Sequence, residues 1–384
     1  MGDGCWVLGD GCWDYYIIMV EIHIFNPETD YALAAGRSIY NAPRRIVDFR
    51  KRMCLFPATY AADGDWIVID DDASDLDPTH LEIAKEKNLQ ILPLSALADR
   101  LSTTAPSQLT PHSLRPWGWN HTLLAQLTKA GVAEKFLKTD AWIDRLRELS
   151  HRRTAIVMQQ RLSELLPDID VAIAREFTSA DEALDVLDNH QPSPITHHPS
   201  AFSQQPSPTS HQPSATSHQP SAYFKLPWSS SGRGVILSST LSPEKLRQWI
   251  EGGIRKQGSV IGERAFNRKG DFATEWEIKD GRAEFLGLSV FRTTAEGRYV
   301  GNIMEPQESL WERIAVMTPD WSQRIIEAQR TALEETIAPD YSGPAGIDML
   351  ADTDRRLNPC VEVNLRQTMG MAALLSYQQT QKQI

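Results

Sequence analysis

The chain has 384 residues, of which 41% are hydrophobic and 23% charged, an ordinary composition for a globular protein of two or three domains. Its formal net charge of −11 argues against a nucleic-acid-binding protein, because such proteins need a basic face to displace counterions from phosphates. No stretch approaches the roughly 18 apolar residues that a membrane span needs. We therefore expect neither nucleic acid nor a membrane as a partner.

The four cysteines are Cys5, Cys12, Cys54 and Cys360, and none lie in CxxC spacing. Neither a zinc site nor a disulfide framework is supported, so we expect a reducing, cytoplasmic setting. The pentapeptide GDGCW occurs twice within residues 1–18, where acidic residues stand in place of the basic start of an export signal. These residues are expected to form an extension outside the fold.

Residues 19–118 alternate between strand and helix patterns. Strands are predicted over residues 20–25, 65–70 and 89–93, with a helix over residues 80–88, which indicates a Rossmann-like domain with a parallel sheet. The loop NPETDYALAAG follows the first strand, where open α/β sheets commonly bind ligands. Asn26, Glu28 and Asp30 are therefore candidates for substrate contact, and helix capping by Asn26 and Thr29 is the alternative.

The middle of the chain is interrupted by a segment of very different composition. Helices are predicted between Trp119 and Gly131, with Gly131 as the C′ residue, and over residues 140–149 and 180–189, with a strand over residues 171–177. Residues 191–222 are then almost only Pro, Ser, His, Gln, Thr and Ala. Such a segment buries too little apolar surface to offset its ordering entropy, so we predict a disordered insert.

A lysine strand and a glycine-serine loop follow the insert. Lys225 lies among apolar and aromatic residues on a strand over residues 223–226, and the loop Ser229 to Gly234 is rich in hydrogen-bond donors. Such a loop can close over a polyphosphate, with Lys225 supplying charge. A plain hairpin turn is the alternative.

Further strands are predicted over residues 260–266, 272–278 and 283–291, after a helix that begins near Ser242. Glu263 is placed to offer backbone groups to an adenine, and Asp271 to bind a ribose hydroxyl. Substrate-side candidates lie between these strands and the C-terminal part of the chain: Arg292, Thr293, Tyr299 and Asn302. An ordinary polar strand end is the alternative for that group.

The segment from Gly346 to Gly370 carries the clearest chemistry. Two short apolar runs flank a polar turn, which predicts paired strands. Side chains alternate along a strand, so Glu362 and Asn364 share a face, and Asp348 on the neighbouring strand can join them. These oxygen donors suit Mg²⁺, and Arg366 can hold a phosphate or carboxylate. A polar sheet face with ordinary cross-strand pairs is the alternative.

From about Asn120 to Gly370, the order of lysine strand, SSSGRG loop, GERAF segment, FLGLSVFRTT strand, GIDML and EVNLR resembles the ATP-grasp superfamily, in its carboxylate-amine ligase and biotin-carboxylase-like branch. The preceding part is similar to the pre-ATP-grasp domain. The resemblance implies an α/β and α+β fold: a Rossmann-like domain over residues 19–118, then a two-lobed ATP-grasp domain over residues 119–384.

The resemblance also implies roles for individual residues. Arg366 and Arg292 would act at the transferring phosphate, and Mg²⁺ would be held by Asp348, Glu362 and Asn364, with Mn²⁺ as an alternative ion. ATP would be bound by the lysine, loop, hinge and ribose positions: Lys225, Ser229, Ser230, Ser231, Gly232, Arg233, Gly234, Glu263, Arg264, Ala265, Phe266 and Asp271. The superfamily usually has a second ATP lysine near residue 120, where this chain has Asn120, which leaves Lys129 or Arg264 as substitutes.

The activity implied by the resemblance is an ATP-dependent ligase that activates a small-molecule or peptide carboxylate as an acyl phosphate for capture by an amine or another nucleophile. A small-molecule kinase and a non-catalytic ATP-binding regulatory protein stay open on the same scaffold. The partners are then ATP and a carboxylate substrate, and a homodimer is a further option.

Overall fold

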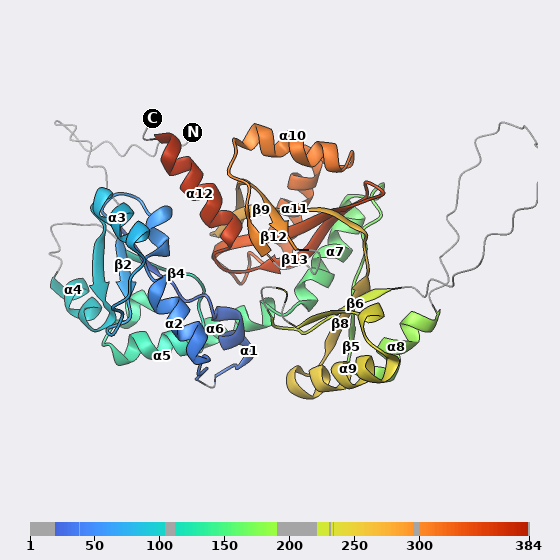
Figure 1. Cartoon of the computed structure of the whole chain (residues 1–384), viewed down its shortest axis with the longest axis horizontal. Coiled ribbons are helices and arrows are strands. Elements are labelled where there is room, and N and C mark those ends of the chain that lie inside the picture. The colour runs from blue at the N-terminus through green and yellow to red at the C-terminus, as the bar shows by residue number, and fades with distance from the viewer. Residues whose placement is uncertain are drawn as a thin grey trace, which may run out of the picture. The chain divides into compact units, whose positions relative to one another are not determined.

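The computed structural model describes residues 20–37, 39–103, 112–189, 221–229, 232, 234–294 and 299–382. The expected N-terminal extension and nearly all of the expected disordered insert lie outside these residues. The chain forms two compact units, shown as ribbons in Figure 1. Unit 1 comprises Met1–Asp144 and Arg366–Ile384, and unit 2 comprises Arg145–Leu365. The sequence predicted a domain boundary near residue 118. In the structure, the residues from 119 to Asp144 belong to unit 1, and so does the end of the chain from Arg366.

Unit 1 is built on a parallel four-stranded sheet in the order β3-β2-β1-β4, as the alternation of strands and helices predicted. The strands are β1 (Val20–Ile24), β2 (Trp66–Ile69), β3 (Gln90–Pro93) and β4 (His112–Pro116). The helices are α1 (Thr29–Ala34), α2 (Arg44–Arg52), α3 (Pro78–Glu86), α4 (Leu97–Thr103), α5 (His121–Lys129), the first half of α6 (Asp140–Leu149) and α12 (Met369–Lys382), with short 3-10 turns at Phe56–Thr59, Leu94–Ala96 and Glu134–Phe136.

The core of unit 1 forms where the sheet meets its helices. Its buried side chains come from strands β1, β2 and β4, from α4 and α5 and from the turn after α5: Ile22, Trp66, Val68, Leu97, Leu114, Leu123, Leu127 and Val132. Helix α5 begins with the N-cap Asn120, whose side chain accepts from the Leu123 N–H, and its apolar stripe faces this core. Burial of these side chains stabilises the packing of the helices on the sheet. Polar side chains lie at the ends of the strands.

Unit 2 contains two antiparallel sheets, the smaller in the order β5-β8-β6-β7 and the larger in the order β11-β10-β9-β12-β13. The strands are β5 (Arg175–Phe177), β6 (Ala222–Lys225), β7 (Val235–Leu237), β8 (Val260–Arg264), β9 (Arg268–Lys279), β10 (Arg282–Thr293), β11 (Tyr299–Asn302), β12 (Gly343–Asp352) and β13 (Leu357–Asn364). The helices are α7 (Arg153–Leu165), α8 (Ala180–Asn189), α9 (Pro243–Gln257), α10 (Gln307–Met317) and α11 (Gln323–Thr336), with a 3-10 turn at Ser238–Thr240.

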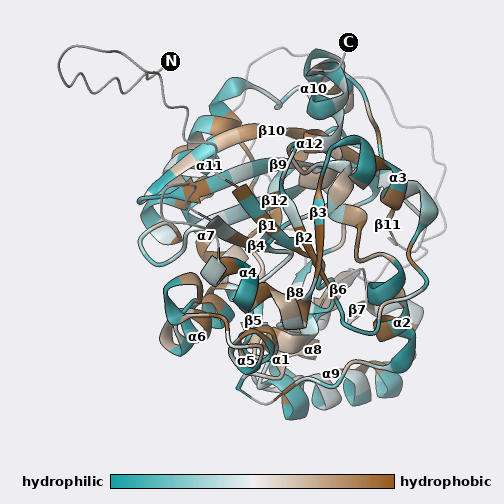
Figure 2. Ribbon diagram, turned by 90° about the vertical axis from the view of Figure 1, so that its left-hand side faces the viewer, coloured by the Kyte–Doolittle hydropathy of each residue, from teal (hydrophilic) through white to brown (hydrophobic). Residues whose placement is uncertain are grey.

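Each sheet of unit 2 has helices packed against one face. Helices α8 and α9 cover the smaller sheet, where Ala183, Leu246 and Ile250 pack against Phe224 and Val260. In Figure 2 the outward side of α9 is hydrophilic, whereas apolar residues are concentrated on the strands. Helices α7, α10 and α11 contact the larger sheet. The predicted strand over residues 171–177 is shorter than expected and begins only at Arg175.

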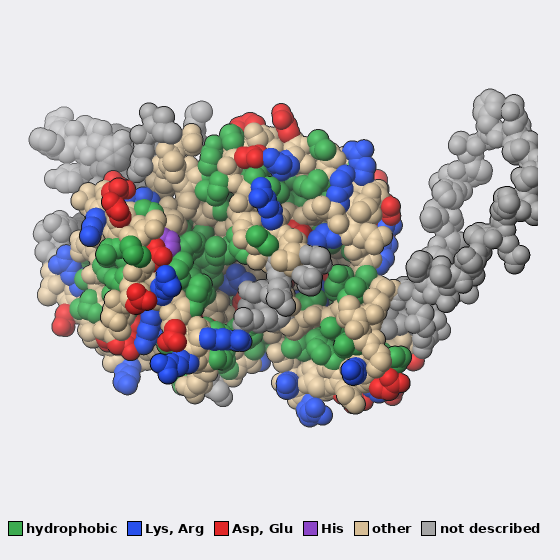
Figure 3. Space-filling model, viewed as in Figure 1, with side chains coloured by type: hydrophobic (Ala, Val, Ile, Leu, Met, Phe, Trp, Pro, Cys, Tyr) green, Lys and Arg blue, Asp and Glu red, His purple; other side chains and the backbone are tan. Residues whose placement is uncertain are grey.

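The strand is shortened by a side chain of α7. The Ala174 N–H donates to Gln159 Oε1 at 2.8 Å, so this stretch of backbone pairs with a side chain in place of a neighbouring strand. Within the described part of the chain, none of the helices combines the length and the hydrophobicity that crossing a bilayer requires. On the face seen in Figure 3, acidic and basic side chains are interspersed over both units.

Candidate functional site

The larger sheet of unit 2 has one face that packs on helices and one that carries acids. Asp348 on β12 lies directly opposite Glu362 on β13, and Gly346 lies opposite Asn364, so the predicted pairing of these strands is confirmed. The amide of Asn364 donates to Asp348 Oδ2 at 3.2 Å. The neighbouring residues Ile347 and Met349 point the other way and are fully buried. The sequence pattern thus indicated which residues share the polar face.

Two more carboxylates lie on the same face, on strand β9. Leu350 pairs with Asp271 and Gly346 pairs with Glu275, which places both acids on the side of Asp348. Glu275 is 1% exposed and accepts a hydrogen bond of 2.8 Å from the hydroxyl of Ser289. Because Gly346 carries no side chain, nothing of that residue separates Glu275 from Asn364. Glu275 was not predicted from the sequence, since only the cross-strand register brings it to this face.

A buried arginine pairs with one of the acids on this face, Glu362. Arg152, immediately before α7, donates from Nη2 to both carboxylate oxygens of Glu362, at 2.8 and 2.9 Å. Its Nη1 donates to Ser229 Oγ at 2.6 Å and to the Leu226 carbonyl at 2.7 Å. The guanidinium therefore ties β13 to the start of the glycine-serine loop. Its Nε is buried without a hydrogen-bond partner, so one donor is left over at this position.

Arg152 was not predicted from the sequence. Lys129 and Arg264 were the candidates for a second cation that binds ATP. Lys129 is exposed on α5 of unit 1, and Arg264 is exposed and pairs with Asp170 at 3.1 Å. The available signal was the pair Arg152 and Arg153 at the start of an apolar-periodic helix, but the sequence does not show which of the two points inward.

Lys225 has a buried acidic partner on the neighbouring strand. Its ammonium lies 2.5 Å from Glu263 Oε1, and both side chains are largely buried. Strands β6 and β8 pair so that Glu263 lies opposite Tyr223, which is two residues before Lys225 on the same face of β6. Glu263 therefore engages the lysine through its side chain, a contact that the proposed adenine role of its backbone did not include.

The segments on either side of this pair are ordered by backbone contacts. The Leu226 N–H donates to the Gly234 carbonyl at 2.8 Å, which closes the glycine-serine loop at its base. Gly234 has φ of +72°, and a Cβ there would meet Leu226 at 2.9 Å, so the position requires glycine. Gly232 is exposed, and Ser230, Ser231 and Arg233 lie outside the described residues.

The expected adenine hinge continues from Glu263 through Phe266. The Ala265 N–H donates to the Ser221 carbonyl at 3.1 Å, and the guanidinium of Arg264 lies 4.7 Å from the centre of the Phe266 ring. The hinge backbone beyond β8 is therefore held to the chain just before β6.

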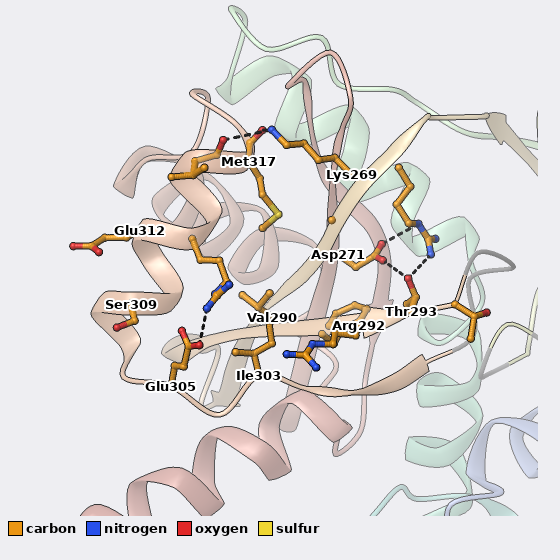
Figure 4. Close-up of a pocket in the computed structure, with 16 residues that line it drawn as sticks. Lys269, Asp271, Val290, Arg292, Thr293, Ile303, Glu305, Ser309, Glu312 and Met317 are labelled. Carbon is orange, nitrogen blue, oxygen red and sulfur yellow. Dashed lines mark hydrogen bonds and ion pairs between the residues drawn. The ribbon is translucent and has the colours of Figure 1, made fainter.

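Asp271 lies at the end of the acidic face in a small polar cluster. Thr293 donates to Asp271 Oδ2 at 2.8 Å, and Arg268 Nε lies 3.1 Å from Oδ1. Burial raises the pKa of the Asp271 carboxyl, an effect that Arg268 and the Thr293 hydroxyl oppose. These three residues line one end of an open cavity of about 970 Å³ between α10 and strands β9 and β10 (Figure 4).

The two arginines expected at the transferring phosphate lie in different surroundings. Phe291 pairs with Asp271 on the acidic face, so Arg292 next to it points to the opposite face, into the cavity beside Val290 and Ile303 (Figure 4). Arg366 belongs to unit 1, where its Nε donates to Asp30 at 2.9 and 3.1 Å. Proximity in sequence to Asn364 did not reveal this acidic partner, which lies 336 residues earlier.

The pKa of a buried thiol, that of Cys360, is affected by the charged groups of the site. Cys360 lies on β13 two residues before Glu362 and is fully buried. Burial raises the pKa of its thiol, and the negative charges of Asp348, Glu263 and Glu362 add to this effect, while Lys225 opposes it. Charged residues from both sheets of unit 2 therefore affect the pKa of the same thiol. The thiol stays protonated and is a packing group.

A second group of possible metal ligands lies in unit 1. Among the described residues, Glu21, His23 and Asp65 have ligand atoms within 4.8 Å of one another. Asp65 accepts from the backbone N–H groups of Glu21 and Ala62, at 3.0 and 2.9 Å, and Glu21 accepts from Arg115 at 2.8 Å. These contacts join strands β1, β2 and β4 at their polar edge, which is a structural role.

No protein-family model matches the sequence, and no curated protein matches it. Solved structures do match the fold. Biotin carboxylase from Campylobacter jejuni, solved as a β-γ-ATP complex, aligns with a TM-score of 0.50 over 94% of this chain and 70% of its own, at 12% identity. N5-carboxyaminoimidazole synthetase from Staphylococcus aureus with ADP gives 0.45 over 94% and 79%, at 11% identity. D-alanyl-alanine synthetase A from Vibrio cholerae gives 0.42 over 71% and 72%, at 13% identity.

At such identities the likeness concerns the fold, and the biotin carboxylase match carries it. It extends over nearly the whole chain and so covers a parallel-sheet unit followed by a unit of two antiparallel sheets. The chain thus has a fold similar to that of biotin carboxylase from Campylobacter jejuni.

Proposed function

We propose that this chain is a Mg-ATP-dependent ligase that activates a carboxylate for attack by an amine. The observation that carries the proposal is the composition of the site in unit 2. Oxygen donors from β12 and β13 lie with two buried cations, Arg152 and Lys225, each of which is paired with a carboxylate. A phosphate chain can pair with Arg152 and Lys225, while a divalent ion can pair with the displaced Glu362.

The residues present fit Mg²⁺. Asp348, Glu362 and Asn364 supply two carboxylates and an amide oxygen on one sheet face, and hard oxygen donors are what Mg²⁺ prefers. Glu275 adds a fourth oxygen donor to that face. When bound, the ion would supply charge neutralisation for the phosphates. Asp348, Glu362 and Asn364 are the residues proposed to hold it, and Mn²⁺ is the natural substitute.

The roles of the chain's own groups follow from their positions. Lys225 and Arg152 bind phosphate oxygens in place of Glu263 and Glu362, and Ser229 stays with Arg152 at the base of the loop. The loop from Ser229 to Gly234 covers the phosphates, and the hinge from Glu263 to Phe266 takes the adenine. Asp271 accepts from a ribose hydroxyl. Positioning and charge neutralisation are the main contributions a protein makes to phosphoryl transfer.

The proposed reaction has two balanced steps. A carboxylate oxygen of the substrate attacks the γ-phosphorus of ATP, the bond to the ADP oxygen breaks, and an acyl phosphate forms. The nitrogen of an amine then attacks the acyl carbon, phosphate leaves with its electron pair, and the nitrogen loses a proton. Arg366 remains a candidate for the substrate side. Arg292, on the opposite face of the sheet, is assigned no part in these steps.

The test measures thermal stability of the full chain with and without Mg-ATP, for wild type and for Asp348→Asn. A ligand at about a hundred times its dissociation constant adds roughly 2.7 kcal/mol to stability. We expect a clear rise in Tm for wild type and little or none for Asp348→Asn. Asp354→Asn, an exposed carboxylate on the same hairpin, is the matched control and should behave as wild type.

A second measurement separates a ligase from a kinase. ADP release is followed with carboxylates alone, with carboxylate and amine pairs, and with hydroxyl compounds. A ligase releases ADP in proportion to an amide product, whereas a kinase releases it with a phosphate ester. Absence of any Mg-ATP stabilisation in wild type at millimolar nucleotide would overturn the proposal.

A further inference from the structure

The carboxyl ends of three parallel strands meet at one edge of unit 1, the edge where open α/β sheets bind ligands. The loop after β1 is fixed to the end of β4 by Asn26. Its amide donates to the Gly118 carbonyl at 2.7 Å and its oxygen accepts from the Gly118 N–H at 3.3 Å. A Cβ on Gly118 would meet the Thr29 side chain at 2.6 Å, so the two segments touch. Neither Asn26 nor Thr29 caps α1, whose N-cap is Glu28.

The charges at this edge do not balance. Arg50 on α2 is held between Glu28 and Asp70, the first through Nη1 and the second through Nε at 3.0 Å. Asp30 is neutralised by Arg366, as described above. One guanidinium thus serves two largely buried carboxylates, which leaves one negative charge that no described contact compensates. A positively charged ligand group would complete the balance.

Three polar atoms here are buried without a hydrogen-bond partner, although such groups are nearly always paired in folded proteins. They are Glu28 Oε2, the Tyr31 hydroxyl and Gln367 Nε2. Glu28 is 9% exposed and Gln367 is 8% exposed. Gln367 is attached to the same edge, because its N–H donates to the Trp117 carbonyl at 2.9 Å and its neighbour Arg366 pairs with Asp30.

The unpaired atoms define the chemistry of a ligand. Glu28 Oε2 only accepts hydrogen bonds, Gln367 Nε2 only donates them, and the Tyr31 hydroxyl does both. We propose that this edge of unit 1 binds a small α-amino acid. Its ammonium group pairs with Glu28, and its carboxylate accepts from Gln367 and Tyr31. The assignment of this amino acid as the amine substrate rests on the proposed ligase function, whereas its binding does not.

The test is isothermal titration of the full chain, without nucleotide, with each of the twenty common L-amino acids up to about 10 mM. We expect at least one to bind, and its N-acetyl derivative, which lacks the ammonium charge, to bind at least tenfold more weakly. Glu28→Gln keeps an oxygen for Arg50 and should weaken binding of the amino acid by a similar factor. Glu82→Gln, an exposed acid on α3, is the control and should bind as wild type.

A second variant separates a ligand site from a structural one. Tyr31→Phe removes a hydroxyl that no internal group uses, so its Tm should equal or exceed that of wild type while its affinity for the amino acid falls severalfold. A lower Tm with unchanged affinity would overturn the proposal, as would binding of no amino acid. Mg-ATP stabilisation is measured in the same samples. If it persists while amino acids fail to bind, only this inference is lost, and the reverse result removes only the ligase function.

Discussion

The candidate sites of the two units treat charge in opposite ways. In unit 2 every buried cation described at the site has an acidic partner within hydrogen-bond distance, Arg152 with Glu362 and Lys225 with Glu263. At the strand ends of unit 1, the described residues include one carboxylate oxygen, one amide and one hydroxyl that are buried without a hydrogen-bond partner. In the proposed Mg-ATP site, buried cations and carboxylates pair with one another when no ligand is bound. In the proposed amino-acid site, no described group of the protein takes the place of the ligand, so three polar atoms have no hydrogen-bond partner.

The largest effect is expected from breaking the pair between Arg152 and Glu362. Arg152→Met removes the guanidinium that donates to both carboxylate oxygens of Glu362, and removing one partner of a buried pair costs about 3 to 5 kcal/mol. Urea unfolding measures the loss. The control is Arg153→Met, because the neighbouring arginine is exposed and its pair with Glu176 is worth less than about 1 kcal/mol. Equal losses in the two variants would show that Arg152 is not a buried charge partner.

The second pair can be tested by coupling. In a double-mutant cycle of Lys225→Met and Glu263→Gln, groups in direct contact show interaction energies of about 0.5 to 3 kcal/mol. We expect a value near 2 kcal/mol in the absence of nucleotide and a smaller one with saturating Mg-ATP, because the lysine then contacts phosphate. A coupling energy that nucleotide leaves unchanged would contradict the exchange of partners in unit 2.

Unit 1 can be perturbed at the ends of its strands. Gly118→Ala forces a methyl group against Thr29, and overpacking of this kind costs about 1 to 3 kcal/mol. Gly301→Ala, at a position with open space around the added carbon, is the control and should change stability by less than about 1 kcal/mol. The Mg-ATP shift of Gly118→Ala should match that of wild type. Loss of that shift would mean that the two sites are not independent.

The smallest effect is a pH dependence near neutrality. His151 is buried against Trp228, and burial lowers the pKa of its imidazole to about 4, with Arg153 adding to the effect and Glu176 opposing it. The unfolded chain therefore binds more protons between pH 6.5 and 4, so stability falls as pH falls through that window. Between pH 7 and 6 the loss is about 0.7 kcal/mol. His151→Asn should reduce this slope, and an unchanged slope would assign the dependence to other groups.

Local pattern was sufficient for much of the fold. Alternation and short apolar runs predicted strands at β1, β2, β3, β6, β8, β9, β10, β12 and β13. Alternation also placed Glu362 and Asn364 on one face, since strand side chains alternate whatever the partner strand. The short strand β5 was extended too far because the sequence does not show that Gln159 takes the hydrogen bond of Ala174. Helix α7 was not identified, although it carries Arg152 at its start.

The charge partners were decided by tertiary structure alone. Arg152 lies 210 residues from Glu362, and Arg366 lies 336 residues from Asp30, so no spacing rule connects them. Glu275 reaches the acidic face through the register of β9 against β12, and Arg292 is turned from it by the same alternation. The sequence by itself determined which residue types the chain has for the proposed Mg-ATP site. Only folding determined which of them face one another, because cross-strand register and burial are properties of distant segments in contact.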